Sequence, residues 1–151
     1  MIALIQRVAE ARVDVAGETV AAIGPGLLAL VGVERADTAA QADRLAERIV
    51  GYRVFADDEQ RMNRSTRDVG GAILLVPQFT LAADTDKGMR ASFAMAAPPE
   101  RGLELFERLV ERVRALGVEV GTGRFGADMK VRLVNDGPVT FRLRAAPPGA
   151  S

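Results

Sequence analysis

Two apolar runs constrain the fold of this 151-residue chain more than any other feature of its sequence. Residues 27–33 and 72–76 consist of Leu, Val, Ile, Ala and one Gly, and the turn Gly24–Gly26 precedes the first run. Short continuous apolar runs bounded by turn residues are typical of strands that are buried on both faces. We therefore expect a sheet whose central strands are covered on each side.

Further strands are predicted around these two runs. Residues 1–8, 11–16 and 19–23 are apolar or alternating, and Ala16–Glu18 suits a hairpin turn. Residues 52–55 predict a short strand, 57–68 a polar loop, and 82–97 an ordered loop. Residues 130–134 and 139–143 predict two closing strands, joined by a turn over 135–138.

Two helices complete the predicted elements. The first begins at Thr38, which has a capping-box spacing to Gln41, and ends at Gly51. The second begins at Pro98-Pro99 and ends before Gly117. Many strands with two helices, not strictly alternating, indicate an α+β fold with a mixed or mainly antiparallel sheet. We expect one domain over residues 1–144 and a disordered tail over 145–151.

The residue types that are missing exclude several kinds of chemistry. The chain contains no histidine and no cysteine, so Ser-His and Cys-His catalysis and zinc sites built on those residues are excluded. The net charge is zero, which argues against a protein that coats nucleic acid. No apolar run approaches the roughly 20 residues that span a bilayer. We expect a cytoplasmic protein with no membrane partner, no metal and no cofactor.

The sequence Gly121–Gly126 matches the G-x-G-x-x-G pattern of dinucleotide sites. That pattern binds a pyrophosphate only where a helix follows it. The residues after Gly126 alternate as a strand, so we interpret the segment as a glycine-rich loop that lets the backbone pass close to a neighbour.

Two other segments each have an ordinary and a functional interpretation. Strand alternation alone would bury Phe79 and Leu81 within Pro77–Leu81, but a strand end also presents Gln78, Thr80 and backbone N–H groups to a ligand. Asn135–Thr140 suits a turn. A cis Gly–Pro bond there would point two successive carbonyls the same way, although only about 5% of such bonds are cis.

The same two segments carry a family resemblance. Pro77–Ala82 resembles the Ser-Gln-Phe-Thr-Leu motif of the D-aminoacyl-tRNA deacylases, and Asn135–Thr140 resembles their Asn-x-Gly-Pro-x-Thr motif. Similar segments occur in order over residues 1–144, namely 1–8, 24–32, 51–55, 82–84, 88–90, 92–93 and 122–129. The resemblance implies a barrel-like sheet, a homodimer, and binding of the 3′ end of aminoacyl-tRNA.

The resemblance also implies a reaction and a set of site residues. The reaction is hydrolysis of the ester of D-aminoacyl-tRNA, and of glycyl-tRNA mischarged on tRNA(Ala), with much of the catalysis supplied by the tRNA ribose. The catalytic residues are Gln78, Phe79 and Thr80, and the backbone N–H groups of Phe79 and Thr80 serve as hydrogen-bond donors. For the Thr80 side chain, a role in positioning ranks first and a role as covalent nucleophile ranks second. Gly137 and Pro138 would enter the other subunit's pocket and exclude L side chains, braced by Arg7; Met129, Asn135 and Thr140 would bind substrate.

Two positions depart from the family pattern. Position 77 is Pro where the motif opens with Ser, so a hydroxyl and a backbone N–H are both absent. Position 91 is Ala where many members have Pro. Pro77 leaves open a deacylase specialised for another mischarged tRNA, and a non-catalytic tRNA-end or nucleic-acid binding protein is a further alternative. The candidate phosphate contacts are Arg64, Arg67, Lys87, Arg90 and Lys130.

Overall fold

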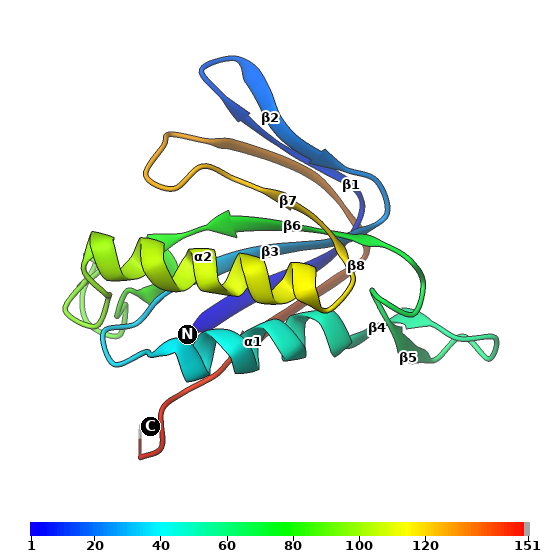
Figure 1. Ribbon diagram of the computed structural model, residues 1–151. Coiled ribbons are helices and arrows are strands. Elements are labelled where there is room, and N and C mark those ends of the chain that lie inside the picture. The colour runs from blue at the N-terminus through cyan, green and yellow to red at the C-terminus, as the bar shows by residue number, and fades with distance from the viewer. Residues whose placement is uncertain (150–151) are drawn as a thin grey trace.

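The computed structural model describes residues 1–149 (Figure 1). Its elements, in chain order, are β1 (Ile2–Val15), β2 (Glu18–Ile23), β3 (Gly26–Gly32), α1 (Ala39–Gly51), β4 (Arg53–Ala56), β5 (Met62–Ser65), β6 (Ala72–Pro77), the 3-10 helix η1 (Phe79–Ala82), α2 (Pro99–Ala115), β7 (Glu119–Thr122) and β8 (Lys130–Arg144).

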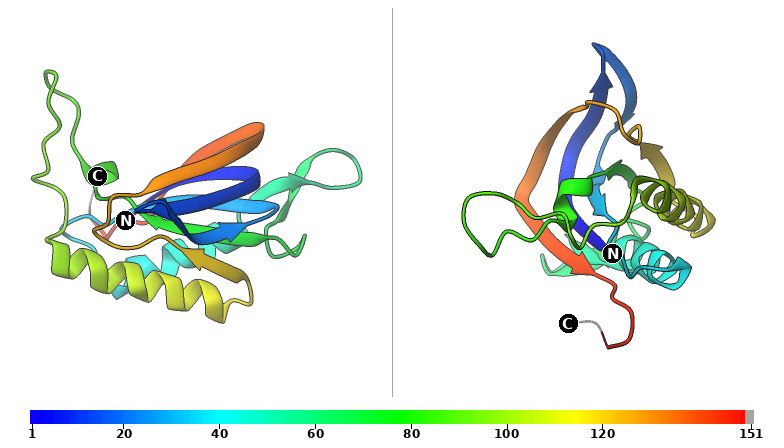
Figure 2. Two further views of the ribbon diagram at one scale, coloured as in Figure 1. Left: turned by 90° about the horizontal axis from the view of Figure 1, so that it is seen from above. Right: turned by 90° about the vertical axis from the view of Figure 1, so that its left-hand side faces the viewer.

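The main sheet is mixed, as predicted. Its strand order is β2-β1-β3-β6-β7, and β8 pairs with β1 along the other edge of that strand. The pairs that β1 makes are antiparallel, whereas β3, β6 and β7 run parallel to one another. The sheet curves strongly into a barrel-like shape, and both helices lie on the same side of it (Figures 1 and 2). The prediction of an α+β fold with two main helices is therefore confirmed.

The two apolar runs form β3 and β6, and their side chains alternate between two cores. Leu27, Ala29 and Val31 face a core that they share with the helices, whereas Leu28 lies in a second core inside the curved sheet. β6 alternates in the same way, with Ile73 in the first core. Because neighbouring side chains of a strand point to opposite faces, a strand between two cores must be apolar throughout.

The two helices pack side by side and are also joined by charge. The guanidinium of Arg108 in α2 donates two hydrogen bonds of 2.9 Å to the carboxylate of Asp43 in α1. The hydrogen bonds from Arg108 hold the pKa of Asp43 below its usual range. The predicted capping box is present, because the Thr38 backbone N–H donates to Gln41 Oε1 over 2.8 Å.

Four details of the strands differ from the prediction, and the first is that the strands predicted over residues 1–8 and 11–16 are one continuous strand, β1. β5 lies within the predicted loop over 57–68 and pairs with β4. β7, which follows the second helix in the chain, was not predicted, and it pairs with β6. The two closing strands are one continuous strand, β8, with the Asn135–Thr140 turn as an irregularity within it. Most of β5 is exposed, so no alternation of apolar residues could reveal it.

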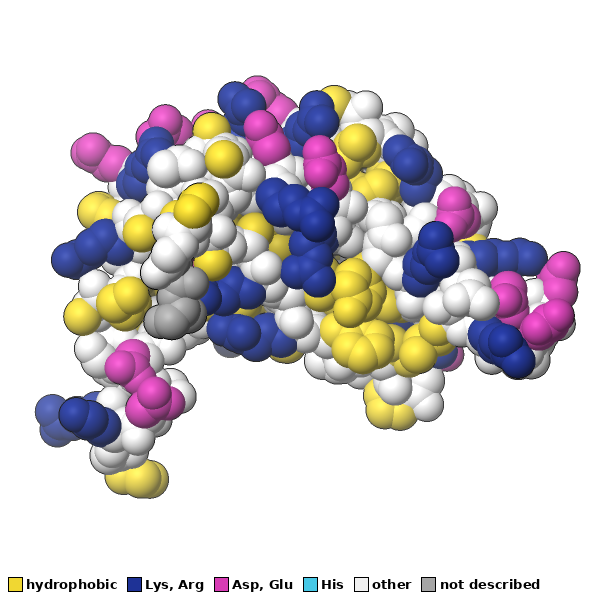
Figure 3. Space-filling model, turned by 90° about the horizontal axis from the view of Figure 1, so that it is seen from below, with side chains coloured by type: hydrophobic (Ala, Val, Ile, Leu, Met, Phe, Trp, Pro, Cys, Tyr) yellow, Lys and Arg dark blue, Asp and Glu magenta, His cyan; other side chains and the backbone are white. Residues whose placement is uncertain are grey.

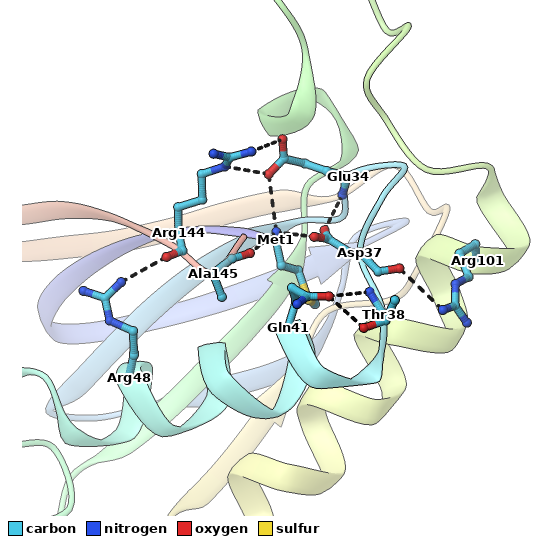
Figure 4. A network of polar contacts seen from close by, with 9 residues as sticks. All are labelled: Met1, Glu34, Asp37, Thr38, Gln41, Arg48, Arg101, Arg144 and Ala145. Atoms are coloured by element: carbon cyan, nitrogen blue, oxygen red, sulfur yellow. Dashed lines mark hydrogen bonds and ion pairs between the residues drawn. The ribbon is translucent and has the colours of Figure 1, made fainter. Parts of the chain in front are cut away.

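Met1 and the end of β8 meet in a polar network (Figure 4). The ammonium group of Met1 lies 2.7 Å from Asp37 Oδ1 and 3.3 Å from Glu34 Oε1, and it donates to the carbonyl of Ala145 over 2.7 Å. Arg144 closes the network by donating to Glu34 over 3.0 Å. This network fixes the first strand to the last one.

The predicted tail over residues 145–151 is described only in part. Ala145 is buried and its backbone N–H donates to the carbonyl of Met1 over 2.9 Å. Residues 150 and 151 lie outside the described residues, so disorder of the tail stays a prediction. Within residues 1–149, no helix is long and apolar enough to cross a membrane.

Candidate active site

The end of β6 delivers Gln78, Phe79 and Thr80 to the surface. The backbone N–H of Gln78 donates to the carbonyl of Val31 over 2.7 Å, which extends the β3–β6 ladder by one residue. The chain then turns into η1, and the first turn of such a helix leaves its N–H groups without partners inside the turn. The side-chain amide of Gln78 donates to the Thr80 hydroxyl, which fixes both side chains.

A cavity of about 490 Å³ lies beside this turn. Among the predicted site residues, Gln78, Phe79 and Met129 line it. Its wall contains no ionisable side chain among the described residues, and it consists of Val31, Val33, Val76, Pro77, Gln78, Phe79, Ala97, Pro99, Gly102, Phe106, Phe125, Gly126, Ala127, Met129 and Val131. A concave apolar wall with few polar groups is the usual form of a small-molecule site.

Glycines allow the walls of the cavity to approach one another. A Cβ on Gly123 would lie 2.9 Å from Met129 Sδ and 3.3 Å from Pro77 Cδ, so only a glycine fits there without movement. The backbone N–H of Gly123 donates to the carbonyl of Leu75 over 2.8 Å. A turn and then β8 follow this segment, so it lacks the helix that a dinucleotide site needs. Gly121 and Thr122 belong to β7, so only the rest of the segment is a loop, and the predicted close passage of the backbone is confirmed at Gly123.

Sequence reasoning did not identify the aromatic wall of the cavity. Phe106 on α2 and Phe125 in the loop after β7 both line it. The helical spacing of Phe106 is equally typical of core packing, so it carries no sign of a cavity. Gly102 is the one local signal of this aromatic wall, because glycine inside a helix lowers stability and so suggests a close neighbour. In the structure, a Cβ on Gly102 would lie 3.4 Å from Phe125 Cζ.

The Asn135–Thr140 turn is held by its own side chains. Asn135 Nδ2 donates to the Thr140 hydroxyl over 2.9 Å, and the Val139 backbone N–H donates to Asn135 Oδ1 over 3.2 Å. The Gly137–Pro138 peptide bond is cis, and both residues are exposed. The polar groups of Asn135 and Thr140 therefore close the base of the turn, and a direct contact with substrate stays a prediction for them.

Arg7 lies beneath this turn. Its Nε donates to the carbonyl of Asp136 over 3.0 Å, and its Nη1 donates to the carbonyl of Val54 over 2.7 Å. A Cβ on Gly137 would lie 2.9 Å from Arg7 Nη2, which shows how closely the guanidinium packs against the turn. The structure thus brings Arg7 into contact with the turn that the sequence analysis paired with it.

Within one chain, the cavity beside Gln78 and Phe79 lies apart from the Asn135–Thr140 turn and its partner Arg7. The wall of the cavity includes neither Arg7 nor any residue of Asn135–Thr140. Exposed large apolar side chains include Phe79, Phe93, Val134 and Phe141. One face of the molecule shows apolar side chains gathered between arginine and lysine side chains (Figure 3).

The candidate phosphate contacts differ in their surroundings. Arg64 forms an ion pair of 3.0 Å with Asp58, and Arg67 donates to the carbonyl of Leu116 over 3.2 Å. Lys87, Arg90 and Lys130 are exposed. Lys87 and Arg90 lie in the segment between η1 and α2, which projects from the body of the molecule (Figure 2).

Comparison with known proteins adds to this geometry. The family model for D-Tyr-tRNA(Tyr) deacylase matches residues 4–144. A D-aminoacyl-tRNA deacylase of Alkalilimnicola ehrlichii is 66% identical over 99% of this chain and 100% of the relative. One of Thioalkalivibrio sulfidiphilus is 64% identical over 98% of this chain and 99% of the relative.

Solved structures have the same fold. A c-Myc DNA unwinding element binding protein superposes with a TM-score of 0.93 at 35% identity, covering 97% of this chain and 100% of the other. A probable eukaryotic D-amino acid tRNA deacylase gives a TM-score of 0.81 at 17% identity over 94% and 98% of the two chains, which is a likeness of fold. On the family match and the full-length identities, this chain belongs to the D-Tyr-tRNA(Tyr) deacylase family.

Proposed function

We propose that this chain is an editing hydrolase that cleaves the ester between a D-amino acid and the terminal ribose of tRNA. The observation that carries the proposal is the position of the η1 turn beside an apolar cavity, whose wall includes Gln78 and Phe79. The deacylase names of relatives that match over the full length support this substrate.

The proposed mechanism depends on main-chain donors and on the substrate. The N–H groups of Phe79 and Thr80 would bind the ester carbonyl oxygen as negative charge develops on it, while Gln78 shapes the pocket. Preorganised donors and correct positioning can supply most of a barrier reduction. The neighbouring ribose 2′-hydroxyl would assist the attacking water, which suits a cavity wall without an ionisable side chain. Met129 and the aromatic wall would hold the terminal adenosine.

We propose that a second copy of the chain supplies the chiral selector. Gly137 and Pro138 are exposed and absent from the cavity of their own chain, so they can enter the cavity of a partner. There they would receive the substrate amino group and leave no room for an L side chain. Glycine has no side chain to exclude, so glycyl-tRNA mischarged on tRNA(Ala) would be a second substrate.

The remaining parts of the proposal concern location and contacts. The enzyme would act in the cytoplasm on the 3′ end of aminoacyl-tRNA. Lys87, Arg90 and Lys130 are exposed and can contact tRNA phosphates, whereas Arg64 and Arg67 already bind groups of their own chain.

A non-catalytic tRNA-end or nucleic-acid binding protein is the second candidate. It is favoured by the 35% identical structure of a protein described as binding a DNA unwinding element. The zero net charge argues against it, because general DNA binding depends on neutralising many phosphates.

A deacylation assay with matched substrates tests the proposal. The chain is incubated with D-tyrosyl-, L-tyrosyl-, glycyl- and L-alanyl-tRNA, and the release of each amino acid is followed. We expect rapid hydrolysis of the D-tyrosyl and glycyl esters and retention of the L esters. Preferential loss of the L-alanyl ester would instead assign the specialised activity suggested by Pro77, and binding without turnover would support the second candidate.

A further inference from the structure

We propose that Phe55 and the Val54 carbonyl on β4 are positioning groups for chiral selection, because they hold Arg7 against the Gly137–Pro138 turn. This inference rests on the proposed function. It adds the β4–β5 hairpin, which contributes nothing to the wall of the cavity, to the parts of the molecule that control specificity.

The guanidinium of Arg7 is held from three directions. Nη1 donates to the carbonyl of Val54 over 2.7 Å, and Nε donates to the carbonyl of Asp136 over 3.0 Å. Arg7 Cζ lies over the ring of Phe55, 6.0 Å from the ring centre. The guanidinium is planar and its donors have fixed directions, so the two hydrogen bonds and the contact with the ring restrict its position.

Core packing anchors β4, on the hairpin side of this arrangement. Val54 is fully buried in the core that the sheet shares with the helices, and Phe55 packs against that same core. The carbonyl that accepts from Arg7 is therefore anchored by packing that does not depend on the turn. The Arg7 side chain itself is only 17% exposed.

The Gly137–Pro138 turn packs directly against the guanidinium of Arg7. A Cβ on Gly137 would lie 2.9 Å from Arg7 Nη2, so there is no free space between the arginine and the selector residue. Arg7 also holds the carbonyl that precedes Gly137. A displacement of the guanidinium would therefore move the turn, and a selector that works by steric exclusion is sensitive to small displacements.

The test measures discrimination in full-length variants. The ratio of kcat/KM for D-tyrosyl-tRNA to that for L-tyrosyl-tRNA is determined for the wild type and for Phe55→Leu, which keeps an apolar side chain but removes the ring. We expect the ratio to fall by about two- to fivefold, which is the range for a partly exposed cation–π contact. Phe55→Tyr keeps the ring and should restore the wild-type ratio.

Tyr52→Leu is the matched control. Tyr52 also packs against the first core and also lies under an arginine, with 5.8 Å between its ring centre and Arg48 Cζ. Arg48 donates to the carbonyl of Arg144 over 3.1 Å, and the Tyr52 ring lies 5.7 Å from the ring of Phe141, which follows Thr140 in β8. Neither contact reaches Arg7, so the control removes a ring under an arginine without touching the Arg7 guanidinium. This variant should keep the wild-type ratio, and a loss equal to that of Phe55→Leu would overturn the inference.

Two further measurements separate this inference from the proposed function. Phe55→Leu combined with Arg7→Lys should discriminate no worse than Arg7→Lys alone, because both changes act through one contact. Amide hydrogen exchange at Val139 should be faster in Phe55→Leu than in the wild type, whatever the substrate. Unchanged exchange and an unchanged ratio would overturn the role of Phe55. A wild type that spares D-tyrosyl-tRNA would overturn the proposed function and with it the role in chiral selection, whereas the exchange at Val139 would still show whether Phe55 holds the turn.

Discussion

Thr80 stands in the first turn of η1, and its hydroxyl accepts a hydrogen bond from the Gln78 amide. No histidine exists in the chain to activate this hydroxyl, and an unassisted threonine is a poor nucleophile. We therefore expect Thr80→Ala to keep kcat/KM for D-tyrosyl-tRNA within about tenfold of the wild type, since the backbone donors remain. Complete loss of turnover with intact tRNA binding would indicate a covalent route.

Gly137 is a second single residue whose substitution has a predictable effect, here on the discrimination between D- and L-aminoacyl-tRNA. A Cβ there would lie 2.8 Å from Val139 Cγ2 and 2.9 Å from Arg7 Nη2, at a backbone φ of +129°. Gly137→Ala must therefore shift an exposed turn, at a stability cost of about 1–2 kcal/mol. We expect L-tyrosyl-tRNA to become a substrate while urea denaturation shows a folded protein. Unchanged discrimination would remove this residue from the selector.

The sequence anticipated part of the cavity and missed another part for a physical reason. Gln78, Phe79 and Met129 line it and belong to segments that resemble family motifs. Phe106 and Phe125 line it equally, but an aromatic side chain on an apolar helix face or in a loop has the same pattern whether it faces a core or a cavity.

At the scale of elements, apolar continuity predicted the strands well only where both faces are buried. β3 and β6 were predicted almost to the residue because two cores require apolar side chains at every position. β5 and β7 have four residues each and little burial, so neither period nor composition could distinguish them from loops.

The parallel pairing of β3 and β6 leads to a stability prediction. A Cβ on Gly26 would lie 1.8 Å from the carbonyl oxygen of Ala72, so Gly26→Ala must force the two strands apart. We expect it to lower the free energy of unfolding by about 3 kcal/mol. Gly51→Ala, at an open position in the last turn of α1, should raise it by about 0.5 kcal/mol. Urea denaturation of both variants measures the two free energies of unfolding, and equal changes in the two variants would contradict the prediction.

For the molecule as a whole, the buried ion pair between Met1 and Asp37 connects the first strand to the first helix. Both groups are fully buried, and the pair distance is 2.7 Å. Asp37→Asn removes the negative charge beside the buried Met1 ammonium. We therefore expect the free energy of unfolding at pH 7 to fall by about 3 kcal/mol. The exposed pair of Asp43 with Arg108 supplies the control, because Asp43→Asn should cost less than about 1 kcal/mol.

The proposed selector makes discrimination a property of two chains. Because Gly137 and Pro138 do not line their own cavity, an isolated chain lacks them at its site. We expect analytical ultracentrifugation to show a particle of twice the mass of one chain. Dilution into the range where it dissociates should lower the D-to-L ratio. A monomer with full discrimination would contradict a selector supplied in trans.

The composition of the cavity wall also determines how the site could be inhibited. Its described lining offers one amide and one thioether, and no amine, thiol, imidazole, carboxylate or hydroxyl. Acylating and carbodiimide reagents therefore find no amine, hydroxyl or carboxylate to capture inside it, and the thioether of Met129 is the one group of this lining open to alkylation. An inhibitor of this site would depend mainly on matching the shape of its apolar wall.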